Sequence, residues 1–236
     1  MPREPVLEVA GLTANYGATP ILTGVDLSIG KGEIVALIGR NGAGKTTTMR
    51  CLIGLLRASG GVIRYHGQDV TRLSADDRAR LGIGYIPQGR EVFPRMTVEE
   101  NLKVGELIGS GRQKSLMDLV FQYFPILQER RKQMAGTMSG GQQQQLAIGR
   151  VLIGSPALIL LDEPSEGVQP SIVQLICRVL RSIRDDLGTT ILFVEQNLDT
   201  ILTMAERGYV MEKGHVVAQL EAGDVSQESV RRHLLL

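Results

Sequence analysis

The sequence predicts an α/β protein with a central parallel sheet, an antiparallel β segment near its N-terminus and an inserted helical segment. Residues 34–38, 158–161 and 191–194 are all apolar, as is typical of parallel strands that are buried on both faces. Helical stretches separate these runs, and an alternation of strands and helices favours a parallel sheet. Between residues 97 and 133 the periodicity becomes purely helical.

The antiparallel segment is predicted from short strand patterns near the start of the chain. Apolar and polar or small residues alternate over residues 25–29, which indicates a half-buried strand. Strand-like stretches also occur at residues 7–10 and 61–65, and together these pieces favour an antiparallel sheet. Later, residues 209–217 predict a hairpin that turns at residues 213–214, and a short helix follows it.

The helical segment has a clear start. Thr97 and Glu100 have the spacing of a capping box, in which each side chain bonds the other residue's backbone N–H. We expect a helical subdomain at about residues 90–155, inserted in one domain that spans residues 1–236. A chain of this length can bury the core of one large α/β domain.

Composition excludes some classes of protein. The chain has 26 Lys and Arg against 25 Asp and Glu, a net charge of +1, with no basic stripe. This balance argues against a nucleic-acid partner. The first residues lack the apolar stretch of a signal peptide, and the longest apolar stretch, 151–161, is far shorter than the ~20 residues of a membrane span. Cys51 and Cys177 are expected to be reduced core thiols, which fits the cytoplasm.

A phosphate-binding loop is predicted at residues 39–47, which fit the pattern G-x-x-x-x-G-K-T between a buried strand and a helix expected to begin near Thr47. Glycines let backbone N–H groups surround a phosphate, and the helix N-terminus adds partial positive charge. We expect Lys45 to reach the β- and γ-phosphates of ATP and the Thr46 hydroxyl to hold Mg²⁺. The candidate nucleotide-binding residues here are Gly39, Asn41, Gly42, Ala43, Gly44, Lys45, Thr46 and Thr47.

Two carboxylates follow the apolar run at 158–161. Asp162 and Glu163 are expected at the carboxyl end of a buried strand, where ligands bind in open α/β sheets. Asp162 suits Mg²⁺, which prefers oxygen ligands. Because neighbouring strand residues face opposite ways, Glu163 is expected to point differently and to polarise an attacking water. A charged pair that merely ends a strand is the alternative.

A second candidate anion site lies at Ser139, Gly140, Gly141 and Gln142, ahead of a helical run. Ser139 and Gln142 have capping-box spacing, so Ser139 could simply be an N-cap. The two glycines would also let a phosphate approach the backbone closely. One explanation for two such sites in one chain is that the second completes a nucleotide pocket in another subunit.

With these motifs in this order, the chain resembles the nucleotide-binding subunits of ABC transporters over essentially its whole length. This resemblance implies a P-loop NTPase core. The resemblance adds Gln88 as the Q-loop glutamine, a contact for Mg²⁺ or the attacking water, and Tyr16 as an aromatic residue that stacks on adenine. It implies a head-to-tail dimer that encloses two ATP molecules, each between the phosphate loop of one subunit and Ser139 to Gln142 of the other. The surface at residues 88–95 would accept a helix from a membrane subunit.

One position departs from the family pattern. Gln196 stands where the family has a switch histidine. A glutamine cannot take up a proton, but its amide can donate a hydrogen bond to the γ-phosphate. We expect hydrolysis to persist because Glu163 is present.

The same glutamine resembles subunits of branched-chain amino acid importers, and residues 88–102, 139–150 and 163–171 look closer to urea and short-chain amide importers. This implies a paralogous ATPase partner or a homodimer, two membrane permease subunits, a periplasmic solute-binding protein, and a place on the cytoplasmic face of the cell membrane. Uptake of urea or short-chain amides is the expected function, with branched-chain amino acids as the alternative. A non-transport ATPase acting on ribosomes or DNA is more remote.

Overall fold

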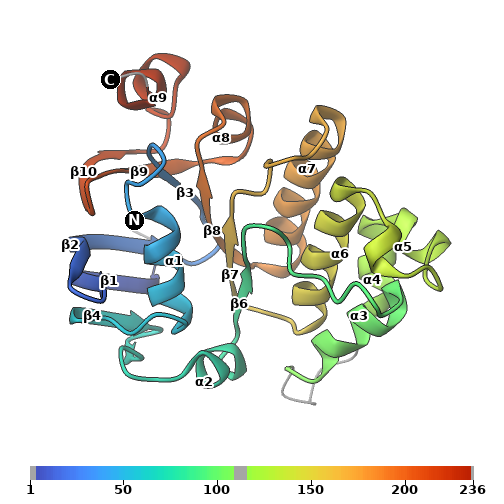
Figure 1. Cartoon of the computed structure of the whole chain (residues 1–236). Coiled ribbons are helices and arrows are strands. Elements are labelled where there is room, and N and C mark those ends of the chain that lie inside the picture. Colours follow the sequence, from blue (N-terminus) through green and yellow to red (C-terminus); the bar gives the residue numbers. More distant parts are fainter. Residues whose placement is uncertain (1–3, 109–115, 235–236) are drawn as a thin grey trace.

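The computed structural model describes residues 4–108 and 116–234. Within them, ten strands form one mixed sheet in the order β5-β4-β1-β2-β10-β9-β3-β8-β7-β6 (Figure 1). The strands are β1 (Pro5–Tyr16), β2 (Thr19–Gly30), β3 (Ile34–Ile38), β4 (Gly60–Tyr65), β5 (Gln68–Asp69), β6 (Ile83–Ile86), β7 (Leu158–Asp162), β8 (Thr190–Glu195), β9 (Arg207–Glu212) and β10 (His215–Leu220).

The predicted fold class is confirmed. Strands β9, β3, β8, β7 and β6 are parallel to one another and form one end of the sheet. Strands β1, β2 and β4 pair antiparallel, as does the hairpin of β9 and β10. The antiparallel strands join the parallel ones through a single residue pair, His215 with Gly24.

Strand β1 is longer than its predicted stretch at residues 7–10. Its pairing with β2 shifts register between Val9 and Leu12, and Gly11 there has a φ of +57°. A bulge of this kind interrupts the period of two on which the sequence prediction rests. The strand therefore continues past the point where the alternation stops.

The helices are α1 (Lys45–Ile53), α2 (Ala75–Arg80), α3 (Val98–Glu106), α4 (Met117–Tyr123), α5 (Pro125–Glu129), α6 (Gly140–Ile153), α7 (Pro170–Leu187), α8 (Leu198–Met204) and α9 (Gln227–Leu234), with a 3₁₀ turn at Ala135–Thr137. Helix α1 begins at Lys45, earlier than the expected start near Thr47, because the left-handed Gly44 already turns the chain into the helix. The Thr97 capping box opens α3 as predicted.

Alternating side chains of the central strands enter two separate cores. In β3, Ile34, Ala36 and Ile38 pack with the helices α3 to α8. Val35 and Leu37 pack instead with α1 and the antiparallel strands. Because both faces are covered, every residue of β3 is buried, which explains the unbroken apolar run.

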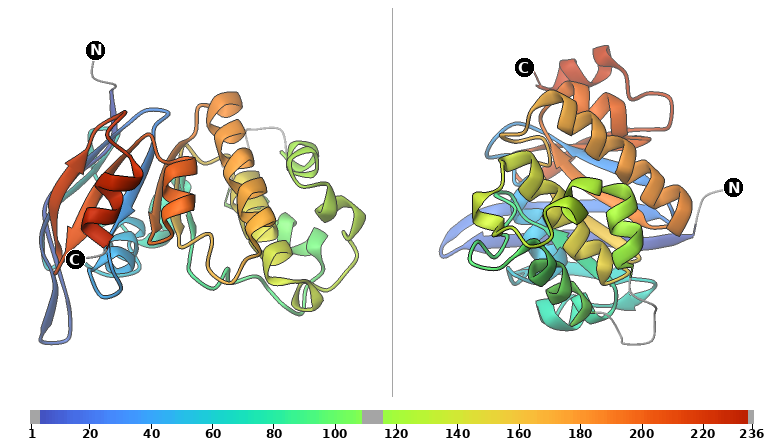
Figure 2. Two further views of the ribbon diagram at one scale, coloured as in Figure 1. Left: turned by 90° about the horizontal axis from the view of Figure 1, so that it is seen from above. Right: turned by 90° about the vertical axis from the view of Figure 1, so that its right-hand side faces the viewer.

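Helices α3 to α6 form a lobe at one end of the molecule, beyond α7 (Figures 1 and 2). Residues 109–115 of the predicted helical segment lie outside the described residues. Helices α3 and α6 meet at Gly105, where a Cβ atom would lie 2.1 Å from Arg150 O. The absent side chain therefore lets the two helices pack closely.

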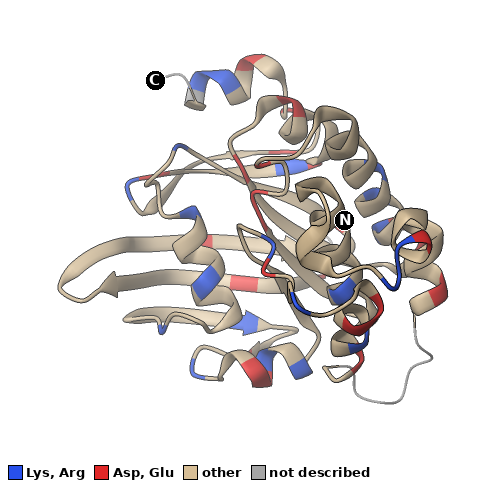
Figure 3. Cartoon of the chain, turned by 45° about the vertical axis from the view of Figure 1, so that its right-hand side comes forward, with Lys and Arg blue, Asp and Glu red and all other residues tan. Residues whose placement is uncertain are grey.

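Cys51 and Cys177 are buried free thiols, as expected. Acidic and basic residues are interspersed over the described part of the chain (Figure 3). Among the described helices, none has the length and hydropathy required to cross a bilayer.

Candidate nucleotide-binding and catalytic site

The predicted phosphate loop connects β3 to α1. Gly42 and Gly44 have φ values of +81° and +104°, a conformation that glycine adopts without steric cost. A Cβ atom at Gly44 would lie 2.8 Å from Leu22 Cδ2, and one at Gly39 would lie 2.5 Å from Met211 O. The loop therefore needs glycine at these positions to turn its backbone amides inward at the start of α1.

Lys45 lies inside this loop, with only 4% of its surface exposed. Its Nζ donates a hydrogen bond to Arg40 O at 3.0 Å and lies 4.0 Å from Glu163 Oε1. Burial lowers the pKa of Lys45, while the neighbouring carboxylates of Glu163 and Asp162 oppose this shift. The side chain is held where a phosphate bound by the loop would meet it.

Asp162 is the last residue of β7 and is 1% exposed. Its Oδ1 accepts a hydrogen bond from Thr46 Oγ1 at 3.2 Å, whereas its Oδ2 has no hydrogen-bond partner among the described residues. Burial raises the pKa of Asp162, and the side chains of Thr46, Lys45 and Tyr85 act in the opposite direction. A buried carboxylate oxygen without a partner beside a hydroxyl is a donor set that fits Mg²⁺.

Glu163 lies beyond the end of β7, so the strand alternation from which its direction was predicted does not orient it. The strand ends at Asp162, and Glu163 has a φ of +47°, which turns its side chain back towards Lys45. Its N–H donates to Val194 O at 3.0 Å and thereby fixes this turn to β8. Burial raises the pKa of Glu163, and Lys45 opposes the rise.

Gln88 approaches the same centre from the loop after β6. Its Nε2 donates to Glu166 Oε2 at 2.9 Å and to Glu163 Oε2 at 3.4 Å. The side chain is exposed, so it can exchange these partners for a ligand. Residues from β3, β6 and β7, far apart in sequence, thus meet at the carboxyl ends of neighbouring strands.

Ser139 and Gln142 form the predicted capping box at the start of α6. Ser139 Oγ accepts from Gln142 N at 3.4 Å, and Gln142 Oε1 accepts from Ser139 N at 3.0 Å. The two glycines also have a role within the chain, because a Cβ at Gly140 would lie 2.9 Å from Arg90 Nη1 and one at Gly141 would lie 3.0 Å from Ile172 Cγ2. Whether this segment also binds a phosphate stays a prediction.

The two remaining predicted residues lie at the edges of the site. Tyr16 ends β1 and is 44% exposed, and its hydroxyl accepts from Arg50 Nη1 of α1 at 3.3 Å. Gln196 follows β8 directly and is exposed. Their proposed contacts with adenine and the γ-phosphate stay predictions.

The sequence analysis missed two residues that hold the loops of the site. Glu195 ends β8, is 1% exposed, and accepts hydrogen bonds from three backbone N–H groups. The guanidinium of Arg90 donates to the carbonyls of Glu166 at 2.8 Å and Gly167 at 3.3 Å. An acidic residue that ends an apolar run, as Asp162 does, was a signal for Glu195. Nothing in the local pattern singles out Arg90.

Comparisons with known proteins agree on the family. The family model described as ABC transporter matches residues 22–166. The high-affinity branched-chain amino acid transport ATP-binding protein BraG of Pseudomonas aeruginosa is 46% identical over 203 residues, which are 86% of this chain and 87% of that protein. The lipopolysaccharide export system ATP-binding protein LptB of Escherichia coli is 34% identical over 232 residues, 96% of this chain and 95% of that protein.

A solved nucleotide-free ATP-binding cassette from an ABC transporter superimposes with a TM-score of 0.82 at 27% identity, covering 98% of this chain and 96% of that one. The expected P-loop NTPase architecture is thus confirmed. Together with the family match over more than half of its length, this shows that the chain belongs to the ABC transporter family and is an ATP-binding, ATP-hydrolysing subunit.

Proposed function

We propose that this chain is the motor subunit of an ABC importer and that its catalytic centre consists of Lys45, Thr46, Asp162 and Glu163. The observation that carries the proposal is the convergence of these four side chains at the ends of β3 and β7. Lys45 and the phosphate loop would bind the β- and γ-phosphates of ATP. Glu163 would accept a proton from the attacking water, with Gln88 and Gln196 orienting the water and the γ-phosphate.

Thr46 and Asp162 would hold Mg²⁺, with Gln88 as a further contact. The orphaned Oδ2 of Asp162 supports this assignment, since a buried carboxylate oxygen without a partner is costly unless a ligand satisfies it. When bound, the ion would neutralise charge on the phosphates.

We further propose that two such subunits, either two copies or this chain and a paralogue, bind ATP at their interface. Helix α1 packs on β7, β2 and β6, whereas α6 packs on β6 and on α3, α4, α5 and α7. The buried side chains of the two helices belong to different cores (Figures 1 and 2). This supports a role for Ser139 to Gln142 in the nucleotide site of the partner. The helical lobe would correspond to the subdomain at about residues 90–155.

A membrane permease subunit would dock near residues 88–95, which places the chain at the cytoplasmic face of the cell membrane. A cavity of about 320 Å³ there is lined mainly by apolar residues, among them Phe93, which is 44% exposed. The side chain of Asn101, fully buried, bonds Phe93 N at 2.8 Å, Phe93 O at 3.0 Å and Thr97 O at 2.9 Å. These bonds fix the backbone of the loop at Phe93.

Branched-chain amino acids are the solute class that the relatives support best. BraG is named for branched-chain amino acid transport, and so is a 36% identical protein of Archaeoglobus fulgidus, LivF, which is described as probable. The expected preference for urea or short-chain amides rests on residues 88–102, 139–150 and 163–171 and is now the second candidate. The motor itself would not touch the solute.

The test is ATP hydrolysis by the chain in proteoliposomes with its permease subunits and paralogue, and with solute-binding protein loaded with leucine or urea. We expect Mg²⁺-dependent hydrolysis that rises with the leucine-loaded protein and is lost in Lys45→Ala. Stimulation by urea instead would favour the second candidate. Phe93→Ala should reduce stimulation by the permease and leave basal hydrolysis unchanged; equal stimulation would contradict the docking surface.

A further inference from the structure

Glu195 carries a buried carboxylate for which the proposed reaction has no use. Its Oε1 accepts from Ser165 N at 3.0 Å. Its Oε2 accepts from Gln196 N at 3.0 Å and from Asn197 N at 2.9 Å. With 1% of the residue exposed, these bonds are shielded from water, and bonds to an ionised acceptor are stronger than neutral ones.

The three donors belong to two different loops. Ser165 lies in the loop between Glu163 and α7, and Gln196 and Asn197 lie in the loop between β8 and α8. The backbone of each loop bears one proposed catalytic side chain, Glu163 in the first and Gln196 in the second. Glu195 thus joins the loop that follows the base to the loop that bears the proposed γ-phosphate contact.

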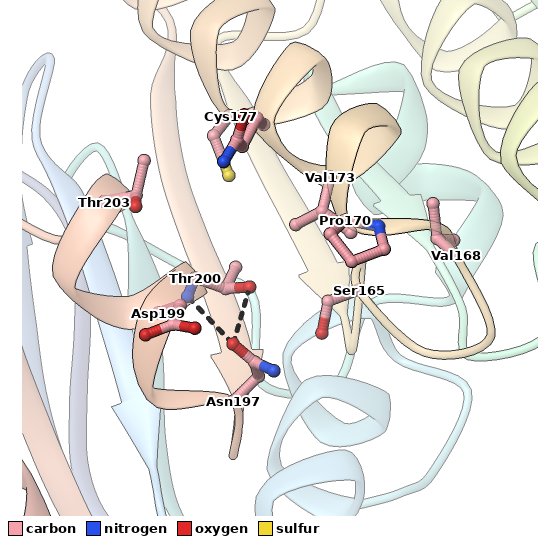
Figure 4. Close-up of a pocket in the computed structure, with 10 residues that line it drawn as sticks. Ser165, Val168, Pro170, Val173, Cys177, Asn197, Asp199, Thr200 and Thr203 are labelled. Atoms are coloured by element: carbon pink, nitrogen blue, oxygen red, sulfur yellow. Dashed lines mark hydrogen bonds between the residues drawn. The ribbon is translucent and has the colours of Figure 1, made fainter.

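A cavity separates these loops where they continue into their helices (Figure 4). It has a volume of about 170 Å³, and Ser165 and Val173 line it together with Asn197 and Thr200. Asn197 Oδ1 accepts from Thr200 N at 3.0 Å and so caps α8 rather than reaching across the cavity. Because packing is incomplete here, the bonds to Glu195 add to the Glu163 N–H bond to Val194 O in holding the two loops together.

The first loop is also held from its other side. Arg90, from the loop that contains Gln88, donates to the carbonyls of Glu166 and Gly167. The loop after Glu163 therefore lies between a buried anion that binds its N–H and a cation that binds its carbonyls.

We propose that Glu195 is a positioning residue for ATP hydrolysis, which fixes the loop after Glu163 to the loop that bears Gln196. The proposal rests on the proposed catalytic centre. A glutamine at position 195 retains one acceptor oxygen and turns an NH₂ group towards a backbone N–H. An aspartate retains the charge but is one methylene shorter, and an alanine removes every bond.

The test compares Glu195→Ala, Glu195→Gln and Glu195→Asp by kcat, KM for ATP and melting temperature. We expect Glu195→Ala to lower kcat by about tenfold or more, since displacements near 1 Å can cost about 100-fold. KM should change by less than about threefold, because the phosphate loop is untouched. Glu195→Gln, which keeps the bulk of glutamate, and Glu195→Asp, which keeps its charge, should each recover only part of kcat. Full recovery in Glu195→Gln would mean that the pocket requires only bulk and would overturn the role of the carboxylate.

Glu33→Gln is the matched control. Glu33 is a less buried glutamate that, like Glu195, accepts from a backbone N–H, that of Gly30 at 2.8 Å, and it also accepts from Arg207. It lies ahead of β3, at the end of the strand away from the site. This variant should lower the melting temperature without lowering kcat.

Glu163→Gln, measured in parallel, separates the two possible failures. If Glu163→Gln is inactive while Glu195→Ala keeps the wild-type kcat, the role of Glu195 is wrong and the catalytic centre stands. The role of Glu195 would also be wrong if kcat fell in proportion to the melting temperature in the variants at both positions 195 and 33. If Glu163→Gln hydrolyses ATP normally, the centre is wrong and this inference fails with it.

Discussion

Replacing Asp162 by Asn should stabilise the nucleotide-free protein and abolish its response to Mg²⁺. In the structure Asp162 is 1% exposed, and its Oδ2 has no partner among the described residues. The residue therefore combines a buried charge with an unsatisfied acceptor, an arrangement that favours ligand binding and disfavours the empty protein. Asparagine keeps the shape and the acceptor for Thr46 while it removes the charge.

The magnitude follows from the burial. A buried polar group without a partner costs about 1–3 kcal/mol, and Lys45 and Thr46 offset part of the cost of the Asp162 charge. We therefore expect Asp162→Asn to raise the free energy of unfolding by about 1–2 kcal/mol without nucleotide. In a chain of this length, about 1 kcal/mol corresponds to a change of about 2–4 °C in melting temperature.

The effect should depend on pH in a defined direction. Burial raises the pKa of Asp162 in the folded protein, so the native state holds this proton more tightly than the unfolded chain does. The cost of the charge is fully present above the folded pKa and is relieved as the pH falls through it. The stability difference between Asp162→Asn and the wild type should therefore shrink as the pH is lowered.

The assay is thermal unfolding with EDTA, with ATP and EDTA, and with ATP and Mg²⁺. At about 100 times its dissociation constant a ligand stabilises the wild type by about 2.7 kcal/mol, and Asp162→Asn should lose the Mg²⁺-dependent part. Asp199→Asn, at an exposed carboxylate, is the control and should change stability little. An Asp162→Asn protein that is no more stable in EDTA, or that keeps the full Mg²⁺ response, would refute the reasoning.

Three further predictions concern the site and the helical lobe. Glu163→Gln should bind ATP but hydrolyse it about 100-fold more slowly or worse. Because burial raises the pKa of Glu163, the kcat of the wild type should fall at acidic pH, with a midpoint higher than the pKa of an ordinary glutamate. A kcat that stays constant down to pH 4 would contradict this. Ser139→Ala and Thr97→Ala should each lower the free energy of unfolding by about 1 kcal/mol through a lost helix cap, which urea unfolding measures. Only Ser139→Ala should also lower ATPase activity. Equal ATPase activities in the two variants would mean that Ser139 is an N-cap and nothing more. Gly105→Ala should destabilise the protein by about 2–3 kcal/mol, since its Cβ would lie 2.1 Å from Arg150 O, and unchanged urea unfolding would count against that close contact.

Local features of the site could be predicted because they depend on residues close together in sequence. The phosphate loop needs glycines within a few positions, two of which adopt left-handed φ values, and both capping boxes join residues three apart. The apolar runs predict buried strands because a strand covered on both faces needs apolar side chains at every position. These patterns fixed the α/β class and most of the candidate residues.

The sequence also determined that this chain has the chemical groups of an ATP-hydrolysing ABC subunit, but only the tertiary structure decided how they meet. Thr46 and Asp162 are 116 residues apart, and Gln88 and Glu163 are 75 apart, so no local pattern could pair them. Glu163 is oriented by a left-handed turn after the end of β7 and not by strand alternation. Glu195 and Arg90 gained their roles from backbone groups of distant loops, which carry no sequence signature because every residue except proline has the same N–H and carbonyl groups.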